Sequence, residues 1–361
     1  MTKAYLLPLL LTKFTLSLLL LFSSYCHSDA MSDVLDREAF ITPLATNAAV
    51  FDISQTGNRL IAVGVRGHIL ISDDDGASWS QSHVPVSVDL TAVHFVDDKY
   101  GWAVGHDSVI LNTTDGGQHW VKQFDGRQLP ELMRNYYGQL HHKYPDNENY
   151  TRLLNEAELV GQNGTLGPLL DVYFVNRERG YVVGAFNQLL TTLDGGTSWQ
   201  PLMEKTSNPY SYHLNALGVI GERMLIAGEQ GLLLNMNLLT QKISPLVSPY
   251  DGTFFSIATD EQGVCISGLR GHLYCSDAIT ERWTRVDTHL QVSLSWVSFV
   301  EQQLLVGSQA GHVLLFNRNR QQFSLLRQLQ VAGPVTSLVP ANKYLVITGL
   351  KGIFTQSRTV L

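Results

Sequence analysis

The sequence lacks several features that mark whole functional classes. Charged residues make up only 16% of its 361 positions, and the formal net charge of −7 comes without any dense run of lysine or arginine. Proteins that bind a phosphate backbone normally carry a basic balance, so general nucleic-acid binding is excluded. Hydrophobic residues reach 44% of the chain, which excludes extended disorder and allows one large domain or two ordinary ones.

Long apolar runs are scarce too, and the one near the start is short. The stretch "FTLSLLLLF" at positions 14–22 follows Lys13 and precedes the small residues Ser28 and Ala30. This order predicts a secretory signal peptide over residues 1–30, cleaved near Ala30. A membrane anchor is the alternative, but the uncharged run is too short to span a bilayer comfortably. We therefore expect an exported mature protein in a bacterial periplasm.

Cysteine occurs three times. Lipidation of Cys26 is disfavoured, because the bulky Tyr25 stands where a lipoprotein signal has a small residue. Cys265 and Cys275 flank "SGLRGHLY", which predicts a hairpin, and pairing of residues 268 and 272 would place the two cysteines opposite each other. That register allows a structural disulfide in an oxidising compartment, whereas a slip of one residue would separate the thiols.

What the chain does contain is a repeat. A strand that ends in glycine, followed by a tight turn and a second strand, occurs seven times, with spacings near 40 residues and one longer interval of 79. The anchor residues are Gly64, Gly105, Gly184, Gly228, Gly268, Ser308 and Gly349. A period near 40 with several short strands per unit is typical of a β-propeller blade.

Each unit predicts four strands, which we name A to D from the inside of the ring outward. The seventh unit ends with little sequence left for a D strand, while the segment "REAFITPLA" at residues 37–45 has no place in the first unit. We therefore predict an all-β protein: a seven-bladed β-propeller over residues 31–361, closed by an N-terminal strand. The long interval places a helical insertion, about residues 126–168, between blades two and three.

Three C-to-D turns share the pattern Ser/Thr-x-Asp-x-Gly-x-x-Trp. A carboxylate at the start of such a turn accepts backbone N–H groups, glycine adopts a positive φ, and the aromatic ring packs between strands. The interpretation is structural; Ca²⁺ binding at residues 73–75 is the alternative, without the alternating ligands of a dedicated loop. The pattern residues after the hydroxyl position are Asp74, Gly76, Trp79, Asp115, Gly117, Trp120, Asp194, Gly196 and Trp199.

This pattern is the Asp-box, or BNR repeat, of sialidase-type propellers, and "GVRGHILISDDDGASW" resembles one branch of them. That branch is the photosystem II stability/assembly factors of cyanobacteria and plastids. The resemblance covers most of the mature chain and implies a non-enzymatic propeller that holds partner proteins. It also implies a role for the arginine-bearing B-to-C turns, which Arg66 and Arg270 match in place and Lys351 matches less well.

The B-to-C turns and the D-to-A links leave a propeller on the same face, so the insertion should lie there as well. Its "LPELMRNYYGQLHHKY" segment has a proline at a helix start and apolar residues at helical spacing, and "NYTRLLNEAEL" predicts a second helix. These apolar residues either dock a protein or seat the cap on the ring. The predicted partner-binding residues are Arg66, His68, Arg270, His272, Lys351, Tyr136 and Tyr137.

Neither a metal nor a cofactor is predicted. His68, His272 and His312 recur after a glycine in three blades and so lie at least one blade apart around the ring, which does not bring three ligands to one point. A sialidase-like glycoside hydrolase is the rival class, but "FITP" at residues 40–43 lacks the arginine of that family's first motif, and no Tyr/Glu pair stands out. A small-molecule or lipid-binding accessory of an envelope transporter, with the cap as a lid, is a third hypothesis.

We therefore expect a non-enzymatic, monomeric scaffold that binds a protein partner, with a membrane protein or complex as the favoured class. Peripheral association with a membrane fits this role. Charge on the B-to-C turns should matter to binding and not to folding.

Overall fold

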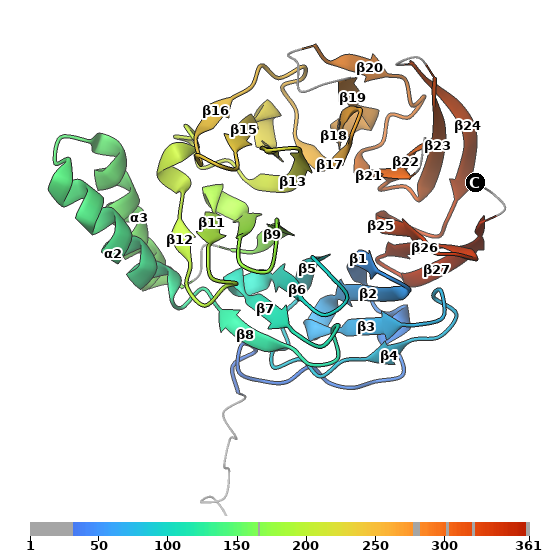
Figure 1. Cartoon of the computed structure of the whole chain (residues 1–361), viewed down its shortest axis with the longest axis horizontal. Coiled ribbons are helices and arrows are strands. Elements are labelled where there is room, and N and C mark those ends of the chain that lie inside the picture. Colours follow the sequence, from blue (N-terminus) through green and yellow to red (C-terminus); the bar gives the residue numbers. More distant parts are fainter. Residues whose placement is uncertain (1–31, 165–166, 277–281, 301–302, 320–321, 359–361) are drawn as a thin grey trace, which may run out of the picture. The chain divides into compact units, whose positions relative to one another are not determined.

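The computed structural model describes residues 32–164, 167–276, 282–300, 303–319 and 322–358, so the expected signal peptide lies outside the described residues. From Val34 onward the chain forms one compact unit. Seven antiparallel sheets follow one another in sequence around a ring (Figure 1). No helix within the described ranges is long and apolar enough to cross a membrane.

Six sheets have four strands and the seventh has three among the described residues. Blades one to three are β1(Val50–Thr56), β2(Arg59–Gly64), β3(Ile69–Ser72), β4(Ser80–Gln81); β5(Leu90–Phe95), β6(Gly101–Gly105), β7(Ile110–Thr113), β8(Val121–Phe124); β9(Leu169–Phe174), β10(Gly180–Gly184), β11(Leu189–Thr192), β12(Gln200–Pro201). Blades four to seven are β13(Leu214–Ile220), β14(Arg223–Gly228), β15(Leu233–Asn237), β16(Ile243–Pro245); β17(Phe254–Asp260), β18(Gly263–Gly268), β19(Leu273–Ser276), β20(Thr284–Val286); β21(Leu294–Val300), β22(Gln303–Ser308), β23(His312–Asn319), β24(Gln322–Gln330); β25(Val335–Pro340), β26(Tyr344–Gly349), β27(Gly352–Ser357). The predicted seven-bladed propeller is confirmed.

The glycine that ends six of the seven B strands has a steric reason; the sixth B strand, β22, ends in Ser308. A Cβ added at Gly64 would lie 2.2 Å from the carbonyl oxygen of Ala49, and at Gly105 it would lie 2.1 Å from that of Asp89. The B strands are buried on both faces, as their near-continuous apolar sequences predict. The repeated glycine therefore marks the place where the backbone that leads into the A strand passes close to the end of the B strand.

Adjacent blades are joined at the centre by one hydrogen bond from a side chain to the next A strand. Every A strand has a bulge after its first residue, which redirects the two side chains that follow. In blades one, three and five, the second of these two side chains accepts a backbone N–H of the next A strand. In the other four blades, the first of the two donates to a backbone carbonyl of the next A strand. The bonds are Val93 N to Asp52, Thr91 to Leu169 O, Leu217 N to Asp171, Asn215 to Phe254 O, Val297 N to Ser256, Ser295 to Val335 O and Thr336 to Val50 O.

The predicted closing strand is wrong. Residues 37–45 form no strand, and β27 is the outermost strand of blade seven among the described residues. The segment instead follows the outside of blade one, where Ala39 N donates to Val84 O at 2.9 Å and Thr42 N donates to Gln81 Oε1 at 3.0 Å. Pro43 has no N–H to give to a ladder. The ring closes through the contact of β25 with β1, and the 3₁₀ turn Ala45–Asn47 contacts β27.

The helical insertion is confirmed as α2(Leu129–Lys143) and α3(Glu148–Asn163). Pro130 occupies the first turn of α2, and the Asn147 side chain caps α3 by accepting the N–H of Asn149. Figure 1 shows both helices beside β12, at the outside of the ring and away from its centre. This position gives no support to the third hypothesis, in which the cap is a lid over a pocket.

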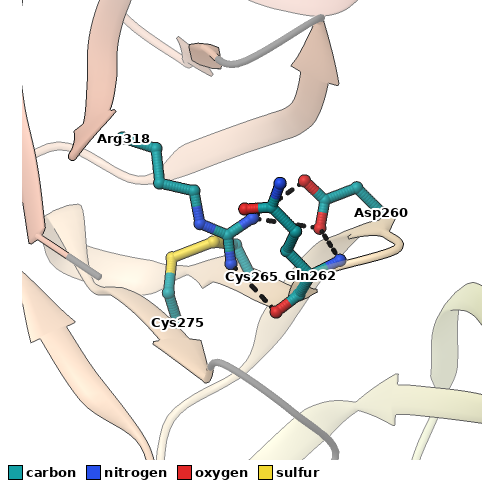
Figure 2. Close-up of a disulfide and its surroundings, with 5 residues drawn as sticks. All are labelled: Asp260, Gln262, Cys265, Cys275 and Arg318. Atoms are coloured by element: carbon teal, nitrogen blue, oxygen red, sulfur yellow. Dashed lines mark hydrogen bonds and ion pairs between the residues drawn. A yellow bond between two sulfur atoms is a disulfide. The ribbon is translucent and has the colours of Figure 1, made fainter. Parts of the chain in front are cut away.

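Cys265 and Cys275 face each other. Cys265 on β18 and Cys275 on β19 are paired in the ladder, and their sulfur atoms are bonded. Figure 2 shows Arg318, from β23 of the next blade, reaching the turn between β17 and β18. Its guanidinium donates to both carboxylate oxygens of Asp260, at 2.8 and 3.0 Å, and to Gln262 O. The disulfide thus cross-links two strands of blade five, and Arg318 joins blade five to blade six.

Candidate partner-binding face

The B-to-C turns of blades one to five share one backbone conformation. Each is a three-residue 3₁₀ turn whose middle residue has a φ between 51° and 56°. A positive φ is uncommon for residues other than glycine, so the repeated use of this turn projects one side chain outward in a fixed direction. The middle residues are Arg66, Asp107, Phe186, Gln230 and Arg270.

Arg66 is exposed, and a hydrogen bond to the link between blades one and two holds its turn. Its backbone N–H donates to Asp89 Oδ1 at 2.8 Å, in the link that leads to blade two. His68 is buried, with 6% of its surface accessible. Burial and the neighbouring Arg66 lower the pKa of His68. The prediction that His68 contacts a partner is therefore wrong, because its ring lies beneath the turn.

Arg270 is exposed beside a small aromatic surface. The His272 ring stacks on Tyr250 with centroids 4.0 Å apart, and its Nδ1 lies 2.9 Å from Leu269 O. Tyr250 belongs to the link from blade four to blade five, so the D-to-A links and the B-to-C turns meet on this face as expected. Arginine next to a stacked aromatic pair is a combination enriched in protein interfaces.

The part of the face between these arginines is not basic. Phe186 is 47% exposed and lies against His213, whose Nδ1 is 2.6 Å from Glu229. Tyr210 lies with His213 in the link between blades three and four and is 76% exposed. Tyr210 was missed from the sequence; its signal is the recurrence of tyrosine in the D-to-A links "PYSYH" and "SPYDG". The face is thus mixed, with cations at separate turns.

Lys351 stands on a different turn. Blade seven connects β26 to β27 through the two residues Leu350 and Lys351, and the positive φ falls on Gly352. Lys351 is exposed but does not occupy the position of the two arginines. Lys351 therefore resembles Arg66 and Arg270 only in lying on the same face of the ring.

The two cap tyrosines predicted to bind a partner, Tyr136 and Tyr137, both contact Glu204. Tyr137 is fully buried, and the hydroxyl groups of Tyr136 and Tyr137 donate to the Glu204 carboxylate at 3.3 and 3.2 Å. Burial and the Glu204 charge raise the pKa of Tyr136 to about 12. The predicted partner role of Tyr137 is wrong for this reason, and Tyr136 is only half-exposed.

The apolar side of the cap belongs to the core. Met133, Tyr137, Leu153 and Ala157 are fully buried in one cluster with residues of blades two and three. Trp102 stacks on Phe174 in that cluster, with ring centroids 3.5 Å apart. The cap is therefore seated on the rim of the ring, and its burial gives no support to a lid over a channel pocket.

The Asp-boxes lie on the opposite face, as C-to-D turns. Asp74 Oδ1 accepts the Ser72 hydroxyl and the Ser78 N–H, both at 2.8 Å, and Gly76 has a φ of 87°. Hydrogen bonds to the Asp74 carboxylate lower its pKa to about 2, and the bond from the Ser78 hydroxyl has the largest effect. The second and third boxes repeat the arrangement with Asp115 and Gly117, and with Asp194 and Gly196.

The tryptophans of the boxes differ. Trp79 and Trp120 donate their ring N–H to the carbonyls of Gly76 and Gly117, at 3.1 and 2.9 Å. The Trp199 ring N–H makes no such bond, although its ring packs edge-on to Phe174 as that of Trp120 does to Phe95. Trp199 is 7% accessible and belongs to the cluster that includes the cap.

The acidic triplet at the first box is distributed over three separate contacts. Asp73 forms a bidentate pair with Arg59, Asp74 holds the turn, and Asp75 accepts from the Asn342 side chain of blade seven. Within the described residues no group of three or more histidine, cysteine or acidic side chains is placed to hold a metal ion.

The fold and these turns define a seven-bladed β-propeller with Asp-box repeats. The family model described as "Photosynthesis system II assembly factor YCF48" matches residues 71–137 and 158–246, and the gap between the two stretches falls in the cap. The chain is therefore a propeller similar to the photosystem II assembly factors, as its motifs indicate.

Individual relatives agree with this assignment. The photosystem II assembly lipoprotein Ycf48 of Synechococcus sp. (strain CC9902) is 30% identical over 92 residues; the match spans 24% of this chain and only 27% of that relative. YCF48 from Cyanidioschyzon merolae has a TM-score of 0.63 at 15% identity, covering 89% of this chain and 99% of that one. A structure of YCF48 bound to D1 peptide has a TM-score of 0.61 at 15% identity, covering 88% and 95%. At these identities the solved structures show the fold alone.

Proposed function

We propose that this chain is a non-enzymatic scaffold that binds a protein partner through its B-to-C face and assists the assembly or stability of a membrane protein complex. The observation that carries the proposal is the pair of exposed arginines, Arg66 and Arg270, on turns of the same strained conformation. Residues other than glycine held in this backbone region cluster at functional sites, which fits a role of the two arginines in recognition.

The ligand class follows from the surroundings of these arginines. Arg270 adjoins the stacked pair of His272 and Tyr250, and Phe186 is exposed between the two arginines. A cation beside exposed aromatic rings favours a polypeptide segment that carries acidic and apolar groups. The relative solved with a bound D1 peptide supports a peptide as the ligand.

We also propose that the protein acts after export, in the periplasm. The sequence of residues 1–30 has the order of a signal peptide, and the curated relative is called a lipoprotein. The Cys265–Cys275 bond fits an oxidising compartment.

The test is an affinity capture from native membranes after chemical cross-linking. The intact protein is compared with the double variant Arg66→Glu and Arg270→Glu. The matched control is Arg134→Glu with Arg285→Glu, which changes the net charge equally at two other exposed arginines. We expect a membrane protein to be captured by the intact protein and the control and lost with the double variant. Equal capture by all three would refute the proposed face.

A further inference from the structure

Blade seven has three strands among the described residues, whereas each of the other six blades has a fourth, so the third strand, β27, forms its outer edge. Lys343 and Arg358 form a hydrogen-bonded pair at the end of the β26–β27 ladder, with Arg358 N donating to Lys343 O at 2.9 Å. In an antiparallel ladder such pairs alternate, so the N–H and C=O groups of Ile353 and Thr355 point away from β26. These groups face the side where a fourth strand would lie.

The other blades show what normally fills this place. The carbonyl of the first residue of the C strand accepts an N–H from the outer segment in blades one, three and four: Ser82 to Ile69, Leu202 to Leu189 and Leu246 to Leu233, each at 2.9 Å. Ile353 is the equivalent residue of blade seven, since it is the first to pair with β26 after the turn glycine. No described residue donates to its carbonyl.

The edge also lacks the features that normally block strand addition. β27 contains neither proline nor a charged residue, and its last three residues are exposed. Its two half-buried apolar side chains point to opposite sides: Ile353 joins the cluster shared with blade one, and Phe354 the cluster with blade six. An added strand with apolar residues at alternating positions would extend both clusters. Leu44, 66% exposed, precedes the 3₁₀ turn that contacts β27 and enlarges the apolar surface there.

Charge decides between possible occupants. Lys351 and Arg358 stand at the two ends of β27. A second copy paired antiparallel along the same edge would bring Lys351 of one copy toward Arg358 of the other, and like charges across strands are destabilising. An extended segment with acidic residues at its ends avoids this repulsion: one end meets the exposed Lys351, and the other meets Arg358, whose guanidinium also donates to Ala341 O at 3.2 Å.

We propose that the outer edge of β27 is a second binding site, which takes an extended, acidic-ended segment of a partner protein as the fourth strand of blade seven. Main-chain hydrogen bonds to Ile353 and Thr355 supply the pairing, and the alternating apolar positions supply the fit. The site is separate from Arg66 and Arg270, which lie on the turns of blades one and five.

The test uses a fluorescein-labelled heptapeptide of sequence DVTVTVD with blocked ends, and measures binding by fluorescence anisotropy. Thr355→Pro removes an outward N–H without removing a bond to β26, as proline is tolerated on an edge strand. Thr355→Val is the matched control that keeps the N–H. We expect saturable binding by the wild type and Thr355→Val, and binding weaker by about tenfold with Thr355→Pro, because a buried hydrogen-bond partner is lost.

Three further comparisons make the outcome decisive. The peptide KVTVTVK should bind about tenfold more weakly, since two favourable charge contacts become repulsive. A version of the acidic peptide that is N-methylated at its edge-facing residues should also fail to bind the wild type, which tests strand pairing even if Thr355→Pro does not fold. The double variant Arg66→Glu and Arg270→Glu should bind the acidic peptide normally, which separates this site from the proposed partner face.

The proposal is overturned if the acidic peptide does not bind, if Thr355→Pro and N-methylation leave its affinity unchanged, or if the lysine peptide binds equally well. A concentration-dependent dimer that Thr355→Pro abolishes would assign the edge to a second copy and overturn it as well.

Discussion

The hydroxyl of Thr336 donates to the carbonyl of Val50 at 2.7 Å and joins the last blade to the first across 286 residues of sequence. It is the closing member of the seven hydrogen bonds that link neighbouring A strands. Thr336→Val keeps the shape of the side chain and leaves the Val50 carbonyl without this donor. We expect the free energy of unfolding to fall by about 1 kcal/mol.

The measurement for Thr336→Val is urea denaturation beside Thr355→Val, which alters an exposed threonine in the same blade. The control should change stability by less than about 0.5 kcal/mol. Equal effects of the two substitutions would mean that the closing bond contributes nothing of its own.

Two carboxyl groups at the centre of the ring should make stability depend on pH. Burial raises the pKa of Asp52 to about 6 and that of Asp171 to about 7, and the negative charge of Asp52 adds to the second shift. Asp52 accepts hydrogen bonds from Val93 N, Ile53 N and Ser337, and Asp171 accepts from Leu217 N and Val172 N. These bonds oppose the shift without cancelling it.

The sign follows from proton binding. Between the ordinary carboxyl pKa and these raised values the folded state binds more protons than the unfolded state, so stability falls as the pH rises. We expect the contribution of these two groups to the free energy of unfolding to decrease from pH 4.5 to about 7 and then level off. Denaturation of Asp171→Asn across this range should show a smaller slope than the wild type. An unchanged slope would show that Asp171 does not titrate there.

The cap should contribute to global stability, because its apolar side is part of the core. Met133→Ala leaves a cavity among Tyr137, Leu153 and the blades, and should cost about 2–5 kcal/mol. Asn135→Ala, on the exposed side of the same helix, is the control. The midpoint of thermal unfolding checks both. A cap that melts separately, with the propeller transition unmoved by Met133→Ala, would contradict the shared core.

The disulfide should stabilise the propeller in an oxidising medium. Cys265→Ala with Cys275→Ala removes a cross-link that closes a short loop, and we expect a loss of about 2–3 kcal/mol. Dithiothreitol should lower the unfolding midpoint of the wild type and leave that of the double variant unchanged. A wild-type midpoint that does not respond to the reductant would show that the bond adds no stability.

Much of the fold was predictable because its signals repeat. The glycine at the end of six B strands marks a close approach of the backbone that leads into the A strand, and the Asp-box marks a C-to-D turn. Single events were harder to predict. The segment that contains Phe40 and Pro43 has the apolar composition of a strand, but its binding along Gln81 and Val84 depends on contacts that no local pattern records.

The candidate site was predictable only in part, for a similar reason. The turn sequence places Arg66 and Arg270 on one face, but it does not show that His68 lies beneath the turn. The helical spacing of the cap correctly marks an apolar side, yet burial of Tyr137 against blade three depends on Glu204, which is distant in sequence. The seven central hydrogen bonds depend on a bulge in each A strand and have no common residue type.

The central claim, that a partner binds across the B-to-C face, is tested most directly by site-specific photo-cross-linking. A photoreactive amino acid is placed singly at Arg66 or Arg270, and for comparison at Ala77 or Leu193, which are exposed in Asp-box turns on the opposite face. We predict a cross-linked membrane protein from the first two positions and none from the other two. Cross-links from the Asp-box positions alone would contradict the account.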